Sequence, residues 1–209
     1  MLRSPDKSNG CWLWHRAWIA LRLGSAAVSI AIGCLMLPQG VDSSAVAQEA
    51  IDPRLEYNVK AVSLYAFGRY VSWPENAFAR TDSPFVIGIF GGNPFGDALD
   101  RIAAKKTLNG RPIAVRQISS AAESDGCHIV FVTRTVTKET EIELFAVAAG
   151  KPILLVGESP GFAQRGGIIN FYYSGSNVRF ELNPDKSVEN RLNLNAKLLT
   201  LGTKASANR

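Results

Sequence analysis

The stretch Gly157-Glu158-Ser159-Pro160-Gly161 has the G-x-S-x-G spacing of a nucleophile elbow, in which a serine attacks an acyl group. It follows an apolar run at 153–156, as an elbow must follow a strand. However, the residue after the serine is Pro160, which has no backbone N–H to stabilise an oxyanion. His128 lies upstream of the serine, whereas in that fold the histidine comes last. The pattern therefore indicates a Pro/Gly turn between two strands.

Cys127 and His128 could supply the thiol and imidazole of a cysteine protease. Neighbours on a strand point to opposite faces, so these two side chains cannot pair with each other. After residue 47 the sequence has one cysteine and one histidine, which cannot hold a metal without scattered carboxylates. We therefore interpret them as a buried thiol beside a core histidine, and we expect neither a metal nor a catalytic residue.

The glycine-rich stretch 90–96 lies between a predicted strand and a predicted helix, where a phosphate-binding loop would lie. Its Gly91, Pro94 and Gly96 do not make the G-x-G-x-x-G spacing of dinucleotide sites, and Pro94 removes one amide that would face a phosphate. The following strand ends in Arg116-Gln117 and not in the acid that binds ribose. We therefore expect no cofactor and assign this stretch a structural role.

Residues 1–47 have the features of a secretory signal peptide. Arg16 and Arg22 precede an apolar segment at 23–37, and the small-x-small pattern Ala45-Val46-Ala47 predicts cleavage after Ala47. The apolar segment is shorter than the roughly 18 residues of a spanning helix, which disfavours the alternative of a permanent anchor. A lipoprotein signal at Cys34 is disfavoured because the apolar run continues past this cysteine.

Residues 48–209 have the length of one domain, which at this size buries about 70% of its unfolded surface. Cys127 is the one cysteine in this part of the sequence, so an intramolecular disulfide is excluded after cleavage. The formal net charge of +5 includes the basic residues of the leader. No run of Lys and Arg is interleaved with aromatic residues, so we do not expect nucleic-acid binding.

The predicted elements alternate between helices and strands. Asp52-Pro53 starts a helix with apolar residues at helical spacing (Leu55, Val59, Val62, Tyr65 and Ala66), which ends near Trp73-Pro74. Further helices are predicted at 94–104 and 138–149, with strands at 85–90, 113–118, 128–133 and 153–156. Segments 168–173 and 178–182 flank a turn and form a hairpin, and a last helical stretch runs through Leu194, Leu198 and Leu199. This order predicts a mostly parallel sheet with helices on both faces and an antiparallel C-terminal hairpin at one edge.

A series of motifs, in this order along the chain, resembles the YfiR/HmsC family of exported proteins. The series covers nearly all of residues 48–209, so we identify this part as a single YfiR-like α/β domain. The motifs lie at 57–61, 70–74, 87–96, 109–112, 127–131, 160–162, 166–171, 178–183 and 198–199.

The resemblance implies a three-layer α/β sandwich and a periplasmic regulator, not an enzyme. Members are similar to a repressor that contacts the periplasmic portion of a membrane-bound diguanylate cyclase, lowers cyclic-di-GMP synthesis and restrains biofilm formation. The implied partners are an inner-membrane diguanylate cyclase or sensor kinase, an outer-membrane lipoprotein, and a second copy in a homodimer. The alternative is a periplasmic small-ligand binding protein that serves a sensor kinase or transport system, which a deep pocket with convergent polar groups would favour.

One position departs from the family. Members often carry a cysteine three residues before the glycine at Gly91, bonded to the cysteine aligned with Cys127, but this chain has Gly88 there. The departure puts the redox control of some members in doubt, and Cys127 is expected to be a free, buried thiol.

The hairpin carries the residues that we expect to contact a partner or a ligand. Arg179 and Glu181 alternate with Phe180, so their side chains leave the strand on the face opposite this phenylalanine. Together with Tyr173 they are candidates for contact if that face is open, and a solvated strand face is the alternative.

Two further motifs have expected structural roles. Trp73 and Pro74 should end the first helix with an aromatic plug, and a share of Trp73 in a partner surface is the alternative. Gly166 and Gly167 should permit close backbone approach or positive φ before the hairpin.

Overall fold

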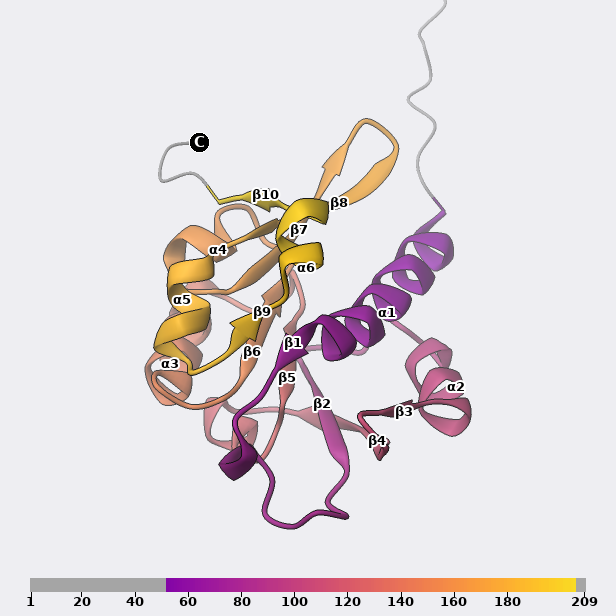
Figure 1. Cartoon of the computed structure of the whole chain (residues 1–209). Helices are drawn as coiled ribbons and strands as arrows, with labels where there is room; N and C mark the ends of the chain where they lie inside the picture. The colour runs from indigo at the N-terminus through magenta and orange to yellow at the C-terminus, as the bar shows by residue number, and fades with distance from the viewer. Residues whose placement is uncertain (1–51, 206–209) are drawn as a thin grey trace, which may run out of the picture. The chain divides into compact units, whose positions relative to one another are not determined.

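An eight-stranded sheet is the centre of the computed structural model, which describes residues 52–205 (Figure 1). The strand order is β10-β8-β7-β6-β5-β2-β4-β3. Neighbouring strands from β4 to β7 are parallel, and β7 and β8 form an antiparallel hairpin. The strands are β2 (Phe85–Phe90), β3 (Thr107–Leu108), β4 (Arg111–Ile118), β5 (Ile129–Val132), β6 (Leu154–Gly157), β7 (Ile169–Ser174), β8 (Asn177–Leu182) and β10 (Thr203–Lys204). The expected mostly parallel sheet with a C-terminal hairpin is confirmed, while the predicted signal peptide, 1–47, lies outside the described residues.

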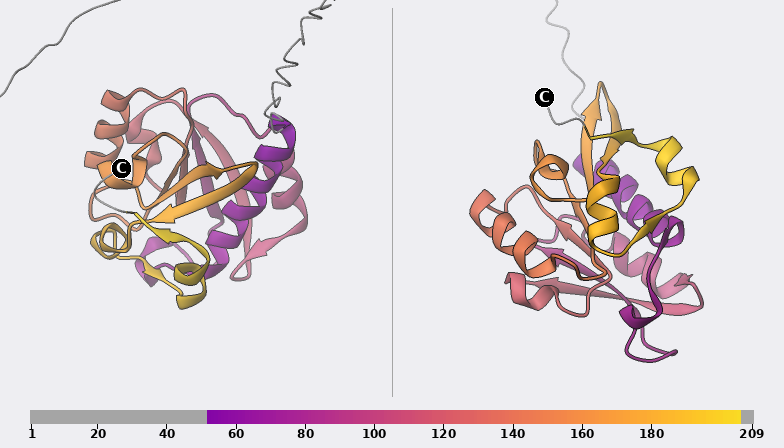
Figure 2. Two further views of the ribbon diagram at one scale, coloured as in Figure 1. Left: turned by 90° about the horizontal axis from the view of Figure 1, so that it is seen from above. Right: turned by 60° about the vertical axis from the view of Figure 1, so that its left-hand side comes forward.

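Helices cover both faces of this sheet and complete the three layers (Figures 1 and 2). The residues that pack on one face come from α1 (Pro53–Tyr70), α2 (Ala98–Lys105) and α6 (Ala196–Leu201). The other face is covered by the 3-10 helix η2 (Ala121–Ser124), α3 (Lys138–Ala148) and α4 (Phe162–Arg165). The remaining elements are β1 (Val71–Ser72), η1 (Glu75–Ala77), α5 (Pro184–Glu189) and β9 (Asn193–Leu194). The β1 and β9 strands pair as a separate antiparallel sheet.

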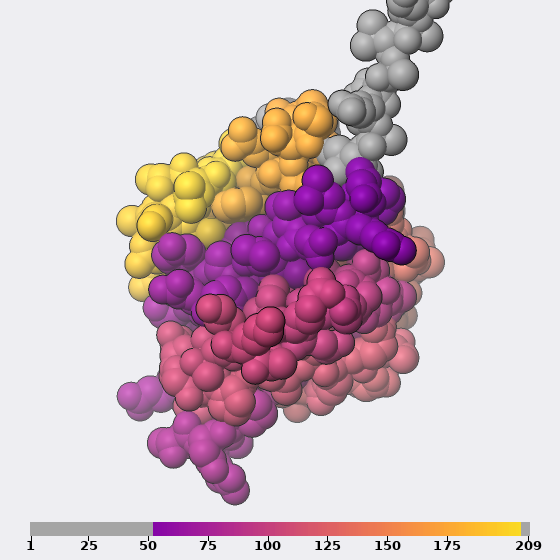
Figure 3. Space-filling view, turned by 90° about the vertical axis from the view of Figure 1, so that its right-hand side faces the viewer, coloured from indigo at the N-terminus to yellow at the C-terminus, as the bar shows by residue number. Residues whose placement is uncertain are grey.

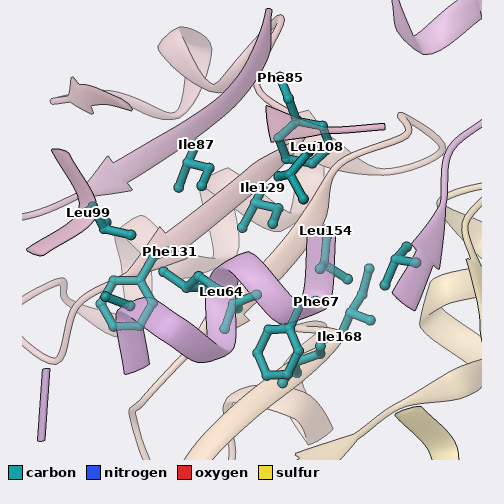
Figure 4. Close-up of a cluster of buried hydrophobic side chains, with 14 of the residues drawn as sticks. Leu64, Phe67, Phe85, Ile87, Leu99, Leu108, Ile129, Phe131, Leu154 and Ile168 are labelled. Atoms are coloured by element: carbon teal, nitrogen blue, oxygen red, sulfur yellow. The ribbon is translucent and has the colours of Figure 1, made fainter. Parts of the chain in front are cut away.

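The larger core lies between α1 and the sheet (Figure 4). Leu64 and Phe67 of α1 are buried against strand residues that include Ile129 and Leu154. Along β2, alternate residues Phe85, Ile87 and Ile89 belong to this core, because successive side chains on a strand point to opposite faces. Each such side chain contributes about 1.5–3 kcal/mol on full burial, so this core anchors α1 over the sheet.

The apolar spacing in the first half of α1 does not mark its buried face. Leu55, Val59 and Val62 are 59%, 41% and 60% exposed, whereas Glu56 and Lys60 are buried. Figure 3 shows α1 and α2 side by side on this surface of the molecule. The helix itself was predicted correctly, because Asp52 caps it by accepting a hydrogen bond from the Arg54 N–H at 2.9 Å. The buried charged residues of α1 pair with residues from loops at the carboxyl ends of β5 and β6. The apolar periodicity of the helix does not indicate such partners.

The second helix begins later than predicted. Residues 93–97 form a turn in which Asn93 Oδ1 accepts from the Phe95 N–H at 2.9 Å, and Gly96 has φ of +55°. This side-chain acceptor competes with helical hydrogen bonding, so α2 starts at Ala98 and not at Pro94. The third helix agrees with the prediction to within one residue.

Candidate functional site

Ser159, the serine of the G-x-S-x-G stretch, is hydrogen-bonded within the turn after β6. Its Oγ donates to Glu141 Oε1 at 2.6 Å and accepts from Arg165 Nη2 at 2.9 Å. The following α4 has only four residues, in contrast to the long helix that an elbow requires. The geometry therefore supports a structural turn at Ser159.

Four charged side chains converge beside this turn, and we call them the charged quartet: Glu56, Lys60, Arg134 and Glu158. Lys60 Nζ donates to Glu158 Oε2 at 2.5 Å and also to Glu56 Oε1. Arg134 Nη2 lies 2.7 Å from Glu56 Oε1 and 3.3 Å from Glu158 Oε2. Each carboxylate therefore contacts both cations. The Lys60 and Glu158 side chains are 2% and 1% exposed, whereas that of Arg134 is 50% exposed.

Three elements position the charged quartet. Glu56 and Lys60 are one helical turn apart in α1, so they share a face of the helix. Arg134 follows β5 and Glu158 follows β6, and these strands are parallel neighbours with Val132 opposite Gly157. Because carboxyl ends of neighbouring parallel strands meet at one edge, the two loops meet under the first turns of α1. Open α/β sheets bind their ligands at this edge.

Hydrogen bonds from neutral groups complete the surroundings of Glu158. Its carboxylate accepts from the Arg134 backbone N–H at 3.0 Å and from the Tyr57 hydroxyl at 3.2 Å. Burial, and then the negative charge of Glu158, raise the pKa of the Tyr57 hydroxyl above its ordinary value. This phenol therefore remains a donor at neutral pH.

Two further pKa shifts favour the charged forms of Glu56 and Arg134. Burial opposes the ionisation of Glu56, but the hydrogen bonds from Lys60 and Tyr173 and the charges of Lys60 and Arg134 together outweigh burial and lower the pKa of this carboxyl. Burial likewise opposes the charge on Arg134, but the hydrogen bond to Glu158 and the negative charges around it together raise the pKa of the guanidinium. Two carboxylates and two cations make the site electrically neutral. These contacts join α1 to the loops that follow β5 and β6.

A cavity of about 350 Å³ opens beside the charged quartet. We call it the β7 groove, and its lining residues are Lys60, Arg134, Glu158, Pro160, Asn170, Phe171, Tyr172, Tyr173 and Val178. Asn170 is 2% exposed, and its Nδ2 donates to Glu181 Oε1 at 3.0 Å. Its Oδ1 has no hydrogen-bond partner among the described residues. Since buried polar atoms are normally paired, this oxygen is a place where a bound molecule could donate a hydrogen bond.

The three hairpin residues expected to contact a partner, Tyr173, Arg179 and Glu181, do not lie on one exposed face. Tyr173 lines the β7 groove and is 43% exposed. Arg179 is exposed opposite Tyr172, so it lies on the other face of the hairpin from Tyr173. Glu181 shares the face of Arg179, as expected, but is only 9% exposed and accepts from Asn170 and Gln164. Of the three, Tyr173 and Arg179 are accessible to a partner.

Trp73 lies away from the β7 groove, at the end of β1. Its ring packs edge-on against Phe85 with centroids 4.9 Å apart, which agrees with the expected plug. Its Nε1 is buried and has no partner in the part of the chain that the structure describes. Pro74 follows in extended conformation and caps η1. A share of Trp73 in a partner surface stays a prediction.

The glycines singled out in the sequence shape the turns around the sheet. A Cβ at Gly91, where φ is +100°, would lie 2.1 Å from Thr133 Oγ1, so only glycine fits there. A Cβ at Gly167 would lie 2.2 Å from the Phe162 ring, which confirms close approach before the hairpin. Gly166 has φ of +140°.

The other structural residues are Phe180 and Pro94. The Phe180 ring packs edge-on against Phe67 of α1 with centroids 5.1 Å apart. This contact holds the hairpin against the helix. Pro94 lies in the turn before α2, together with Gly96.

Cys127 is a buried free thiol, as expected. Burial raises its pKa, although Arg116 Nη2 donates to its Sγ at 3.1 Å. A Cβ at Gly88 in β2 would lie 3.7 Å from the Cβ of Cys127, which lies just before β5, so the two side-chain positions are adjacent.

His128 is hydrogen-bonded in the core. Its Nδ1 accepts from the Val86 N–H at 3.0 Å, its Nε2 lies 3.1 Å from the Ala77 oxygen, and its ring stacks on Phe78 at 4.3 Å. Burial lowers the pKa of His128 to about 4. The imidazole is therefore neutral at pH 7 and fills a structural role.

None of the four members of the charged quartet was expected from the sequence. Glu158 was part of the stretch examined for its serine, and Arg134 follows a predicted central strand. Polar residues directly after apolar parallel strands are a signal for a site at the sheet edge. Glu56 and Lys60 are spaced i and i+4, which places an acidic and a basic side chain on one face of the helix and was a second signal. The apolar residues of α1 are more numerous and suggested a different buried face.

Two kinds of feature are absent from residues 52–205. No group of three or more His, Cys, Asp or Glu side chains is placed there to bind a metal ion. No helix in this part of the chain is long and apolar enough to cross a membrane.

Comparison with known proteins supports the resemblance noted in the sequence. No curated protein matches the chain. The family model described as YfiR/HmsC-like matches residues 57–203, from the first turns of α1 to the start of β10. The match includes three members of the charged quartet and every residue that lines the β7 groove. The chain belongs to the YfiR/HmsC-like family.

Proposed function

We propose that this chain is a periplasmic regulatory protein that binds the periplasmic portion of an inner-membrane signalling protein. Its target is a diguanylate cyclase, which it represses, so that it restrains cyclic-di-GMP-dependent biofilm formation. Membership of the YfiR/HmsC-like family supports this proposal, because the resemblance implies such a regulator.

The observation that carries the proposal is the β7 groove beside the hairpin of β7 and β8, which projects from the body of the domain in Figure 1. The groove holds exposed Tyr173, and the opposite face of the hairpin holds exposed Arg179. A projecting element with an accessible aromatic and an accessible arginine suits docking, since these residue types are enriched at interfaces.

The chemistry of the site also favours docking over turnover. The charges of the charged quartet are engaged with one another, and Ser159 is held by Glu141 and Arg165. A buried network of this kind positions elements of a fold. We therefore propose that the charged quartet presents the β7 groove to a partner and does not transform a substrate.

Three finer assignments belong to the same proposal. The signalling protein could equally be a sensor kinase with a periplasmic domain, and an outer-membrane lipoprotein could sequester the regulator. We also propose a homodimer, since the resemblance implies that family members can dimerise. The predicted signal peptide at 1–47 supplies the route to the periplasm.

The test is co-purification of the tagged, exported chain from detergent-solubilised membranes, with partners identified by mass spectrometry. We expect a membrane protein with a diguanylate cyclase domain, and we expect deletion of the gene to raise cyclic-di-GMP and biofilm mass. Arg179→Glu should weaken the complex, whereas Lys105→Glu, an exposed charge reversal on α2, should not. Unchanged cyclic-di-GMP after deletion, with no signalling protein recovered, would contradict the proposal.

A small-ligand binding protein is the second candidate. It is favoured by the unpartnered Asn170 Oδ1 in the wall of the β7 groove. Native mass spectrometry of the purified chain should then show a bound small molecule that is lost in Asn170→Leu. A mass equal to that of the polypeptide alone, under conditions that preserve complexes, would count against this candidate.

A further inference from the structure

We propose that the β7 groove is a strand-addition site. In this proposal an extended segment from the periplasmic portion of the membrane partner pairs with the free edge of β7. The inference rests on the proposed function and specifies how the partner is recognised.

The pairing of β7 with β6 ends early. The last paired residues are Gly157 and Asn170, after which the chain leaves the sheet through Glu158, Ser159 and Pro160. Beyond Asn170, β7 continues for four residues, which pair only with β8. One edge of this part of β7 is therefore without a neighbouring strand.

The hydrogen-bond pattern of the hairpin shows which backbone groups face this free edge. The Asn183 N–H donates to the Ile168 oxygen at 2.8 Å, so residue 168 faces β8. Along an antiparallel ladder, the backbone N–H and C=O groups of successive residues point alternately toward and away from the partner strand. Those of Asn170, Tyr172 and Ser174 therefore also point toward β8. The N–H and C=O of Tyr173 therefore point away from β8, toward the free edge, and no strand of the described residues pairs with them.

The shape of the cavity agrees with an edge site. Four consecutive residues, Asn170 to Tyr173, line the β7 groove. Since successive side chains of a strand point to opposite faces, a cavity that touches all four must run along the edge of the strand. Four residues of a strand span about 13 Å, which suits a segment of about four residues.

The chemistry of the edge favours the main chain of an extended peptide. Alternating N–H and C=O groups are matched by another strand, and side-chain pockets beside them supply specificity. The charged quartet is neutral as a whole, so the groove favours a segment of uncharged residues. Asn170 Oδ1 would accept a hydrogen bond from a side-chain donor of that segment. Residues 169–174 contain no proline and no charged residue, which are common means of blocking edge pairing.

The experiment compares Tyr173→Pro with Tyr173→Ala in binding to the periplasmic portion of the co-purified membrane protein, with dissociation constants from calorimetry. Both variants lose the ring, but only proline lacks the N–H at the free edge. Proline at this position leaves the pairing with β8 intact, because that N–H is not part of the hairpin ladder. We expect Tyr173→Pro to bind about tenfold more weakly than Tyr173→Ala. This factor corresponds to the loss of one hydrogen bond worth about 1.4 kcal/mol of binding free energy.

Amide hydrogen exchange of the unaltered chain is the second measurement, and it does not depend on a variant. We expect exchange at the Tyr173 amide to slow by about tenfold or more in the complex, as for an amide that enters a strand ladder. Equal binding by the two variants, or a Tyr173 amide that exchanges equally fast when bound, overturns strand addition but leaves the proposed function standing. Failure of the unaltered chain to bind any membrane protein refutes the proposed function itself.

Discussion

Lys60 Nζ lies 2.5 Å from Glu158 Oε2, which joins the second turn of α1 to the end of β6 across 98 residues of sequence. Both side chains are almost fully buried. The pair is the link between the outer helix and the edge of the sheet at which the β7 groove opens.

Lys60→Met should lower the free energy of unfolding by about 3–5 kcal/mol, because it leaves Glu56 and Glu158 buried with only Arg134 as a cation. Urea denaturation checks the value. In Lys60→Met/Glu158→Gln the loss should be smaller than the sum of the two single losses, since the pair is coupled. Strict additivity would mean that the two side chains do not interact. Glu189→Gln, in an exposed ion pair with Lys186, is the control and should change stability by about 0.5 kcal/mol or less.

His128 should make the domain less stable in mild acid. The pKa of His128 is about 4 in the folded chain, whereas its ordinary value, which applies to the unfolded chain, is 6.5. As the pH falls, the unfolded chain therefore binds a proton before the folded chain does. The contribution of His128 to the free energy of unfolding is therefore fully present above pH 6.5 and declines toward pH 4, by about 3 kcal/mol in total. NMR titration of the imidazole gives the pKa directly. Urea denaturation at pH 7 and pH 4.5 should show a larger difference for the unaltered chain than for His128→Gln, and equal differences would assign the effect to other groups.

Gly88→Cys should form a disulfide with Cys127. The two Cβ positions would be 3.7 Å apart, close to the mean of disulfide geometry, about 3.8 Å. The bond should raise the free energy of unfolding by about 2–4 kcal/mol, a gain that a reductant removes. In the chain cleaved after Ala47, thiol titration in denaturant should find one thiol without the substitution and none in the oxidised variant. Two titratable thiols after oxidation would show that the strands hold these positions apart, and Gly88→Ser is the control that adds bulk without the bond.

Gly167→Ala should destabilise the domain, since its Cβ would lie 2.2 Å from the Phe162 ring and 2.9 Å from the Phe162 carbonyl oxygen. The backbone must shift, which costs about 1–3 kcal/mol. Gly92→Ala is the matched control, because a Cβ at Gly92 would have no atom within 4 Å. Thermal unfolding followed by circular dichroism distinguishes the two variants. Equal midpoints would contradict the close packing of the turn before β7.

Much of the fold followed from local patterns. The four central strands and α1 were predicted because apolar runs, Pro53 and the glycine turns are signals that lie within a few residues of their effect. The short elements α4, α5, β9 and β10 were not expected, since two to six residues carry too little periodicity to identify them. In α1 the exposed Leu55 and Val62 show the limit of periodicity, which identified a helix but not its buried face.

By itself the sequence determined the order of elements, the family and the absence of an amide donor after Ser159, because apolar runs, turn signals and Pro160 are properties of the residues themselves. Only the tertiary structure decided the site. The charged quartet forms because β5 and β6 are neighbours and α1 crosses their carboxyl ends, and each of its contacts outside α1 joins residues 24 or more positions apart. The β7 groove likewise exists because β6 leaves the sheet two residues into β7, a mismatch in length between strands that no local pattern records.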